Sequence, residues 1–246
     1  MKCIHLSFSK SSSDGGISVA IRNLINSQRT IGIDAYWLTS EDFKIISRGE
    51  SYFSAIKKLS PDIVQIHGLW RRPTRLANSL RKEKIPYIIS PHGMLNAWAL
   101  KRSRLKKVLA WHLWELNALK HSSCIHALSE TESSFIREKN LSIPIAKISN
   151  GTNVPSINKY GKISKNFYLG KDADTSKTLL FLGRFHEVKG IHLLIDAWKS
   201  ITNEAIAHNW WLVLVGYGDN GELYKKVKSE KDNGFLKRVS VLGPVF

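Results

Sequence analysis

Two cations stand five residues apart in a loop between apolar segments in the second half of the chain. Arg184 and Lys189 occur in FLGRFHEVKG, and their spacing differs from a Walker A loop, where Ser or Thr directly follows the lysine. An arginine fork with a lysine point charge can hold a diphosphate and stabilise charge that grows on it as it leaves. The alternative is surface charge around a turn. It is disfavoured because a cation at a helix N-terminus opposes the helix dipole, and a bound anion would remove that conflict.

Histidines stand at the ends of two apolar segments. His92, in ISPHGMLNAW, should project into a crevice, where it could donate a hydrogen bond to a substrate hydroxyl or act as a base. The alternative is a ring satisfied by loop carbonyl groups. His67, in IHGLW, is a second candidate, although its ring could instead pack under Trp70. His126 lies within an apolar segment, and we expect it to be structural.

A pair of glycines follows the first apolar segment of the chain. Gly15 and Gly16, in SKSSSDGGIS, would let backbone N–H groups approach a phosphate at a helix N-terminus. The segment lacks the G-x-G-x-x-G pattern, so a flexible loop with Asp14 or Ser13 as the helix cap is an equal alternative.

Metal and disulfide chemistry find no support in the sequence. There is no H-E-x-x-H and no paired C-x-x-C, and the single D-x-D, Asp172 to Asp174, falls in a polar segment. We therefore expect no metal and no cofactor. The two cysteines, Cys3 and Cys124, both lie in apolar segments, which indicates buried free thiols in a reducing cytoplasm.

The positive charge of the chain is concentrated in one region. The formal net charge is +17 with a pI near 9.9, and residues 71–107 carry eleven Lys or Arg against one acid, Glu83. Such a patch indicates an anionic partner: nucleic acid, a phosphorylated ligand or acidic lipid. A nucleic-acid-binding module is the rival class, but no RRM, KH or helix-turn-helix pattern is present, so we expect no nucleic acid.

Short apolar segments alternate with helical patterns along the chain. We predict strands in KCIHLSF, DAYWLTS, DIVQIHG, PYIISPHG, SCIHALS, PIAKISNG, TLLFLG, WWLVLVG and VSVLG. This alternation is typical of an α/β fold with parallel sheets wrapped by helices. Ligands of such sheets bind beyond the carboxyl ends of the strands, where His67, His92, the Gly15–Gly16 pair and Asn150 are expected to converge.

The strand and helix pattern lapses once, between two Rossmann-like domains. We predict a first domain over residues 1–155, a polar linker over 156–176 and a second domain over 177–246. A doubly wound domain needs roughly 100–150 residues, so the second, with 70, is expected to be incomplete.

A helix is predicted from about Trp98 to Lys120. On a helical wheel, one apolar stripe should face the sheet: Leu105, Val108, Leu109, Leu113, Leu116 and Leu119. Arg104, Lys107, Trp111 and Trp114 fall on the opposite face. Cations beside tryptophans are typical of a helix on an anionic membrane surface. The alternative is that the tryptophans pack on a neighbouring helix or on the other domain.

No segment predicts insertion into a membrane. The chain has no run of about eighteen apolar residues and no signal peptide. We expect a cytoplasmic protein, at most peripheral to the inner face of a membrane.

Several of these segments together resemble one known family. SDGGIS, IVQIHGLW, ISPHGMLNAWALK, IHALSETE, ISNGTNVP, LLFLGRFHEVKGIHLLIDAW, WLVLVGYGD and VLGPVF stand in the order found in retaining glycosyltransferases of family four (GT4). The resemblance covers essentially the whole chain and implies the GT-B architecture of two facing Rossmann-like domains. It also implies transfer of a sugar, with retention, from a nucleotide-diphosphate donor to a hydroxyl of a glycan or lipid-linked acceptor in polysaccharide biosynthesis.

The resemblance also implies roles for individual residues. Arg184 and Lys189 would grip the donor diphosphate, and His92, the catalytic candidate, would contact the transferred sugar. The remaining candidates are Gly15 and Gly16 closing on the diphosphate, Gly216, Gly218 and Val245 lining the nucleotide base, and His67 and Trp70 on the acceptor side. Enzymes of this kind usually need no metal.

The chain departs from the family pattern at its end. The resemblance implies a Glu-rich E-x7-E motif that binds the donor sugar and ribose in the later part of the second domain, and the sequence given stops at residue 246, before that part. We therefore expect weak or absent activity of the chain as given. A catalytically inactive partner protein, paired through the second sheet, is the remaining alternative.

Overall fold

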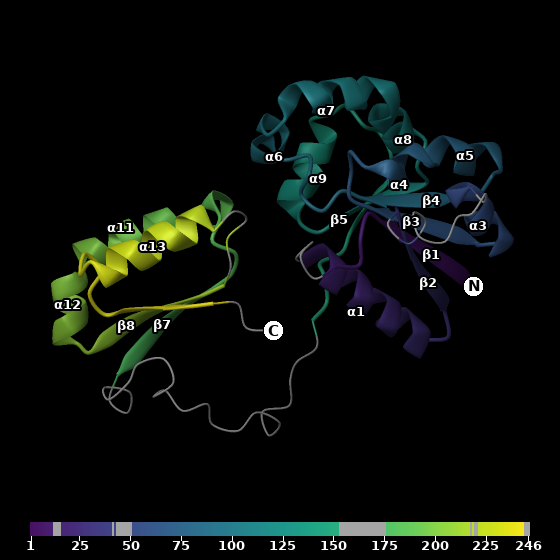
Figure 1. The fold of residues 1–246 in the computed structure, drawn as a ribbon. Coiled ribbons are helices and arrows are strands. Elements are labelled where there is room, and N and C mark those ends of the chain that lie inside the picture. Colours follow the sequence, from purple (N-terminus) through teal and green to yellow (C-terminus); the bar gives the residue numbers. More distant parts are fainter. Residues whose placement is uncertain are drawn as a thin grey trace. The chain divides into compact units, whose positions relative to one another are not determined.

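The structure is a computed structural model that describes residues 1–11, 16–40, 42, 51–152, 176–216, 218 and 221–243. The chain forms two compact units, Met1–Val154 and Pro155–Phe246 (Figure 1). The predicted linker lies outside the described residues except for its last position, Ser176. Each unit is described by itself below.

The first unit is built on a parallel six-stranded sheet with the order β2-β1-β3-β4-β5-β6. All six predicted strands are present, which confirms the α/β class: β1 (Lys2–Ser7), β2 (Asp34–Thr39), β3 (Ile63–His67), β4 (Tyr87–Ser90), β5 (Cys124–Ala127) and β6 (Ile145–Lys147). Because every strand is parallel, the carboxyl ends of β3 and β4, with His67 and the His92 turn, share one edge of the sheet as expected.

Helices connect these strands. They are α1 (Gly16–Thr30), α3 (Tyr52–Lys58), α4 (Arg72–Arg75), α5 (Ala77–Lys82), α6 (Ala97–Lys101), α7 (Arg104–Ala110), the π-helical turn η2 (Trp111–Glu115), α8 (Leu116–Lys120) and α9 (Glu130–Arg137). Figure 1 shows α1 on one side of the sheet and α4, α5, α7, α8 and α9 on the other.

The two faces of this sheet differ in chemistry. The face toward α3, α5, α8 and α9 is apolar and forms the main core, with Ile4, Leu6, Val64, Ile66, Ile89 and Ile125 fully buried. On the strands the intervening residues point to the opposite face. These are His5, Gln65, His67, Ser90 and His126; the register pairs His5 with Gln65 and His67 with Ser90. A row of polar side chains therefore crosses four strands on the side of α1.

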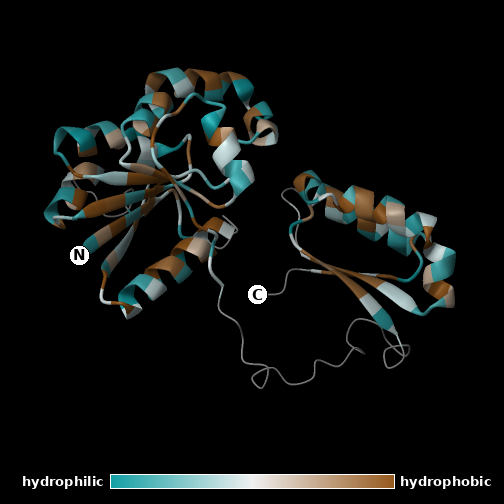
Figure 2. Cartoon of the chain, turned by 180° about the vertical axis from the view of Figure 1, so that it is seen from behind, coloured by the Kyte–Doolittle hydropathy of each residue, from teal (hydrophilic) through white to brown (hydrophobic). Residues whose placement is uncertain are grey.

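The predicted helix over 98–120 is not continuous, and of its predicted buried stripe only Leu116 and Leu119 pack on the core. Ser103 has a left-handed backbone (φ 55°) that separates α6 from α7, and the π turn follows α7. A single 3.6-residue period cannot be carried across such interruptions. Leu105, Leu109 and Leu113 are consequently 85%, 61% and 65% exposed, and Val108 is exposed as well. Figure 2 shows hydrophobic positions along this outer helical layer.

The tryptophans predicted to face outward pack inward instead. Trp111 is half-buried against the main core, with its ring centroid 6.3 Å from that of Trp70. The Arg75 guanidinium lies 4.2 Å from the centroid of the Trp114 ring, and Lys107 lies over Trp70. Only Arg104 of the four predicted outward residues is exposed. The packing alternative therefore accounts for the tryptophans.

The second unit has a three-stranded parallel sheet with the order β7-β8-β9. Its elements are β7 (Lys177–Leu182), the 3₁₀ turn η5 (Glu187–Lys189), α11 (Ile191–Ser200), α12 (Thr202–Ala207), β8 (Trp210–Val215), α13 (Glu222–Asp232) and β9 (Val239–Leu242). Ile191, Ile195 and Trp198 of α11 pack with Val227 of α13 on Leu212 and Leu214 of β8. Figure 1 shows α11 and α13 on the same face of the sheet. The helix α12 was not predicted.

Two glycines bring the ends of β7 and β8 into close contact. Gly216 has φ 149°, and a Cβ atom there would lie 1.8 Å from the Gly183 carbonyl oxygen. Gly183 N–H donates to the Val215 carbonyl at 3.0 Å. The backbone therefore cannot accommodate any side chain at position 216.

We predict that Gly216→Ala will destabilise the second unit by about 3 kcal/mol, because it combines a backbone clash with an unfavourable φ. Hydrogen exchange of the β7 and β8 amides measures this loss separately from the first unit. Gly234→Ala is the matched control: φ is 78°, but nothing lies within 4 Å of its Cβ position. The control should cost only about 1 kcal/mol. Equal protection in the two variants would contradict the clash.

Candidate functional site

Tight turns follow β3 and β4 at the carboxyl edge of the first sheet. Gly68 and Trp70 after β3 have φ 80° and 67°, and His92 and Gly93 after β4 have φ 53° and 73°. Left-handed backbone is uncommon for residues other than glycine, and for a tryptophan it is a clear exception. These turns must therefore be held by contacts from other elements.

Three imidazoles form a continuous hydrogen-bonded chain that ends at this edge. His5 Nδ1 lies 2.9 Å from His67 Nε2, and His67 Nδ1 lies 3.0 Å from His92 Nε2. The rings are stacked, with centroids 5.2 Å and 5.3 Å apart. At the far end, His5 Nε2 lies 2.7 Å from Gln28 Oε1 on α1. The structure thus connects a helix on one side of the sheet to the predicted catalytic histidine.

The Gln28 carbonyl oxygen sets the direction of this chain. Because that oxygen only accepts, His5 Nε2 must carry the proton, and neutral His5 then accepts at Nδ1. His67 donates from Nε2 to His5 and accepts at Nδ1 from His92 Nε2–H. His92 therefore carries its lone pair on Nδ1. In this arrangement the remaining nitrogen of a neutral His92 ring, Nδ1, can accept a hydrogen bond but cannot donate one.

Burial keeps all three rings neutral. It lowers the pKa of His67 well below its usual value, and the nearby His92 and His5 lower it further. Burial also lowers the pKa of His92 to about 4. It lowers the pKa of His5 as well, although the hydrogen bond that His5 donates to Gln28 raises it. A base of pKa about 4 is weak at neutral pH. The free nitrogen of His92 can therefore accept a hydrogen bond, but it is a poor proton acceptor at neutral pH.

A second ordered chain lies beside the first on the same face of the sheet. His126 Nε2 donates to the Ile148 carbonyl at 2.8 Å, so its Nδ1 accepts from Ser90 Oγ at 3.1 Å. Gln65 Nε2 donates to the same hydroxyl at 2.9 Å. His126 is thus occupied on both nitrogens, which agrees with the structural role expected for it.

Glu132 holds the turn that carries His92. This buried carboxylate accepts from Gly93 N–H at 2.6 Å and from Leu128 N–H at 2.8 Å. Sequence reasoning missed it, although Ser129 and Glu132 have the S-x-x-E spacing of a capping box. Ser129 Oγ does accept from Glu132 N–H at 3.2 Å. The Glu132 carboxylate thus accepts from the turn after β4 in place of the backbone of Ser129, the N-cap residue of its own helix.

A second buried carboxylate, Glu115 of η2, holds the turn after β3. It accepts from Trp70 N–H at 2.5 Å, from Thr74 Oγ1 at 2.6 Å and from Trp114 Nε1 at 2.8 Å. Burial raises the pKa of this carboxyl, and these hydrogen bonds counter part of the rise. Glu115 therefore maintains the left-handed backbone of Trp70, and no sequence pattern indicated it.

His67 and Trp70 do not behave as a pair. His67 is buried between His5 and His92 with both ring nitrogens occupied, whereas Trp70 packs with Trp111. The interpretation that His67 packs under Trp70 is wrong. His67 positions His92, and neither of its ring nitrogens is left to bind an acceptor substrate.

The predicted cations of the second unit flank a short turn. Arg184 is half-buried directly after β7, and Lys189 is exposed at the end of η5. Lys189 stands two residues before the first residue of α11, with Gly190 in a left-handed conformation (φ 65°) between them. Lys189 thus lies outside the helix, and its conflict with the helix dipole is smaller than the sequence suggested.

The glycines of the 216–218 segment support this turn through backbone contacts. Phe185 and Gly218 form a β-bridge, and a Cβ atom at Gly218 would lie 3.2 Å from the Phe185 carbonyl oxygen. Together with the Gly183–Gly216 contact, the bridge fixes the path of the chain around Arg184. This structural role exists beside the predicted contact with a nucleotide base.

Other predicted positions are only partly described. Gly16 begins α1, with nothing within 4 Å of its Cβ position. Gly15, Val245 and the Asp172–Asp174 pair lie outside the described residues.

The described ranges contain no group of three or more His, Cys, Asp or Glu that could hold a metal ion. No helix within them has the length and apolar character needed to cross a bilayer. Both cysteines are free thiols; Cys3 is buried as predicted, whereas Cys124 is only partly buried.

Comparison with protein families identifies both units. A model of the glycosyl transferase 4-like domain matches residues 26–151, just over half of the chain. The chain belongs to the GT4-type glycosyltransferases. A model of the glycosyl transferases group 1 matches residues 168–245. The family resemblance inferred from the sequence motifs is therefore confirmed.

Solved structures confirm the GT-B fold of this glycosyltransferase. Sucrose-phosphate synthase from Thermosynechococcus elongatus has a TM-score of 0.70 at 16% identity, covering 100% of this chain and 71% of that one. Alr3699/HepE from Anabaena, in complex with UDP-glucose, has a TM-score of 0.67 at 16% identity, covering 100% and 70%. WaaG, a glycosyltransferase involved in lipopolysaccharide biosynthesis, has 0.61 at 12% identity, covering 100% and 70%. Curated protein sequences gave no match. The rival class of nucleic-acid-binding module gains no support.

The first unit should lose stability in acid because its histidines are neutral when folded. Between pH 6.5 and about 4 the unfolded chain binds protons that folded His92 does not, so the free energy of unfolding falls as pH falls. For His92 we predict a loss of roughly 1–2 kcal/mol between pH 7 and pH 5, and burial of His5 and His67 adds a loss in the same direction. Urea unfolding of the chain at a series of pH values, with hydrogen exchange of the β1 and β3 amides as the readout, measures this loss. His92→Asn should reduce the slope, and a free energy of unfolding that does not change with pH would contradict neutral burial.

Glu132→Ala should destabilise the first unit by about 3 kcal/mol, because two buried amides lose a charged acceptor. Glu132→Gln keeps one oxygen acceptor and should lose less. The control is Glu130→Ala on the same helix, whose exposed ion pair with Lys147 should contribute less than about 0.5 kcal/mol. Denaturant titration compares the three variants. Equal stability of the Glu132→Ala and Glu130→Ala variants would refute the anchoring role.

Proposed function

We propose that this glycosyltransferase moves a hexosyl group from a nucleotide-diphosphate sugar to a hydroxyl of a glycan or lipid-linked acceptor, with retention, in polysaccharide biosynthesis. The observation that carries the proposal is the histidine chain from Gln28 to His92, which presents an imidazole lone pair at the carboxyl edge of the sheet. The similarity to HepE, solved with UDP-glucose, and to WaaG of lipopolysaccharide biosynthesis supports the substrate class.

In this proposal His92 accepts a hydrogen bond from a hydroxyl of the transferred sugar. A neutral ring suits this task, because it adds no positive charge beside an oxocarbenium-like centre. His67, His5 and Gln28 hold the ring in the required tautomer, and Glu132 holds its backbone. Of the two predicted acceptor-side residues, His67 and Trp70, Trp70 remains the candidate.

Arg184 and Lys189 would bind the diphosphate of the donor and stabilise it as the leaving group. Gly16, the first residue of α1, and Gly15, which precedes it in sequence, would contact the same diphosphate. Gly216, Gly218 and Val245 would contact the base. Two fixed cations can supply the charge that a metal ion supplies elsewhere, so we propose a metal-independent reaction.

We also propose that the enzyme works in the cytoplasm at the inner face of a membrane. The outward side of α7 and η2 supports this, because Leu105, Leu109 and Leu113 are exposed beside Arg104 and Lys106. Exposed leucines among cations are the composition of a surface that binds anionic lipid.

The donor site is tested by measuring UDP and UDP-glucose binding by calorimetry. Arg184→Ala and Lys189→Ala should each weaken binding about 10- to 100-fold, because each removes a charge-assisted contact. Lys226→Ala, an exposed lysine of α13, is the matched control and should bind as the unaltered chain does. Equal weakening by all three substitutions, or none, would contradict a specific clamp. In the same preparation, an inverted anomeric configuration of any product would contradict retention.

A further inference from the structure

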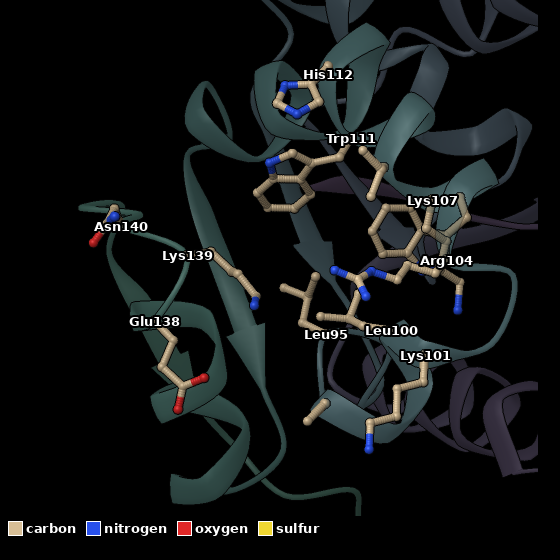
Figure 3. A pocket seen from close by; sticks show the side chains of 13 residues that line it. Leu95, Leu100, Lys101, Arg104, Lys107, Trp111, His112, Glu138, Lys139 and Asn140 are labelled. Carbon is tan, nitrogen blue, oxygen red and sulfur yellow. The ribbon is translucent and has the colours of Figure 1, made fainter.

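A cavity of about 500 Å³ lies in the first unit between the α6–η2 layer and the end of α9. Its lining includes Trp70, the acceptor-side candidate, but none of the three histidines of the hydrogen-bonded chain. The other lining residues come from the segment after β4, from α6, α7 and η2, and from residues 138–140 at the end of α9. Figure 3 shows these side chains around the cavity. The volume is within the range of small-molecule sites.

The cavity has an apolar inner wall. The Trp70 and Trp111 rings lie 6.3 Å apart between centroids, and Leu95 is fully buried beside them. Leu100 and Val108 complete this wall. Such a surface favours an aliphatic or aromatic portion of a ligand over a free sugar or a simple ion.

Cations surround the same space. Lys101, Arg104, Lys107 and Lys139 line it against one acid, Glu138. Figure 3 shows Arg104, from α7, and Lys139, after α9, extending toward each other across the cavity. Over the described part of the chain, none of these four cations forms an ion pair with a carboxylate. Their charge is therefore available to an anion.

Lys107 is one of the two cations of this group that are partly buried. Its ammonium group donates to the Ala99 carbonyl and lies 5.7 Å from the centroid of the Trp70 ring. Burial lowers the pKa of Lys107, and the Arg102 charge lowers it further. An anion in the cavity would offset both effects, because opposite charge stabilises a desolvated ammonium.

We propose that this cavity binds a phosphate-bearing amphiphile, with the phosphate between Arg104 and Lys139 and the aliphatic part against Trp70 and Trp111. The inference rests on the proposed function and gives the chemical class of its acceptor or of the acceptor's carrier. The cations favour the phosphate group of the ligand, and the tryptophan wall favours its aliphatic part. Exposed Leu105 and Leu109 on the same helix would contact the surface from which such a molecule comes.

The test uses the whole chain and a monomeric short-chain probe, dihexanoyl phosphatidic acid, with tryptophan fluorescence as the readout. We expect saturable binding, weakened at least 10-fold in Arg104→Gln/Lys139→Gln. Lys106→Gln is the matched control, since Lys106 lies on the same helix but outside the cavity. Unchanged affinity in the double variant, or equal loss in the control, would overturn the proposal. So would equal affinity for dihexanoyl phosphatidylcholine or for inorganic phosphate.

A second arm separates the cavity from the membrane surface. Leu105→Gln/Leu109→Gln should reduce binding to phosphatidylglycerol vesicles several-fold while leaving the affinity for monomeric dihexanoyl phosphatidic acid unchanged. Loss of monomer binding in this variant would overturn the assignment to the cavity. UDP binding measured on the same variants keeps the two proposals apart. If the chain binds UDP but not the lipid probe, the cavity proposal is rejected and the donor-site proposal stands. If it binds the lipid probe but not UDP, the donor-site proposal is rejected and the cavity proposal stands.

Discussion

The need of buried imidazoles for hydrogen-bond partners governs the first unit. One face of its sheet carries His5, Gln65, His67, Ser90 and His126, where an ordinary doubly wound domain would carry aliphatic side chains. A buried polar group without a partner costs about 1–3 kcal/mol. The two ordered chains avoid this cost by fixing each ring's tautomer, the Ser90 hydroxyl and the rotamer of Gln28. The position of α1 and the chemistry at His92 therefore depend on each other.

Two carboxylates perform the corresponding task for the turns at the sheet edge. Glu132 reaches from α9 to the His92 turn, and Glu115 reaches from η2 to the Trp70 turn. Each accepts backbone N–H groups that left-handed turns leave outside the strand ladder. The helices thus do more than cover the apolar face. They determine where the loops of the site stand, and the π turn places Glu115 inward at the cost of exposing the leucines before it.

The local sequence pattern was sufficient to predict the strands, the α/β class and the convergence of His67 and His92. The spacing of apolar residues and the residue types at strand ends can both be seen within a short segment. The pattern failed over 98–120, where Ser103 and the π turn interrupt the period. It also could not find Gln28, Glu115 or Glu132, since each acts on a segment more than twenty residues away in sequence. The glycines at 216 and 218 were noticed, but their contacts with Gly183 and Phe185 depend on how two strands meet.

One strand of the second unit has a consequence for handling the protein. Among the described strands β7 pairs only with β8, and Leu179, Leu180 and Leu182 are 42%, 57% and 73% exposed. Within the described residues no strand pairs with its other edge, and its side chains are largely apolar, with Lys177 as the single charge in the strand. Edges of this kind recruit further strands, so solutions of the chain should self-associate with rising concentration through β7. The chain would then remain monomeric only in buffers, or with fusion partners, that shield this edge.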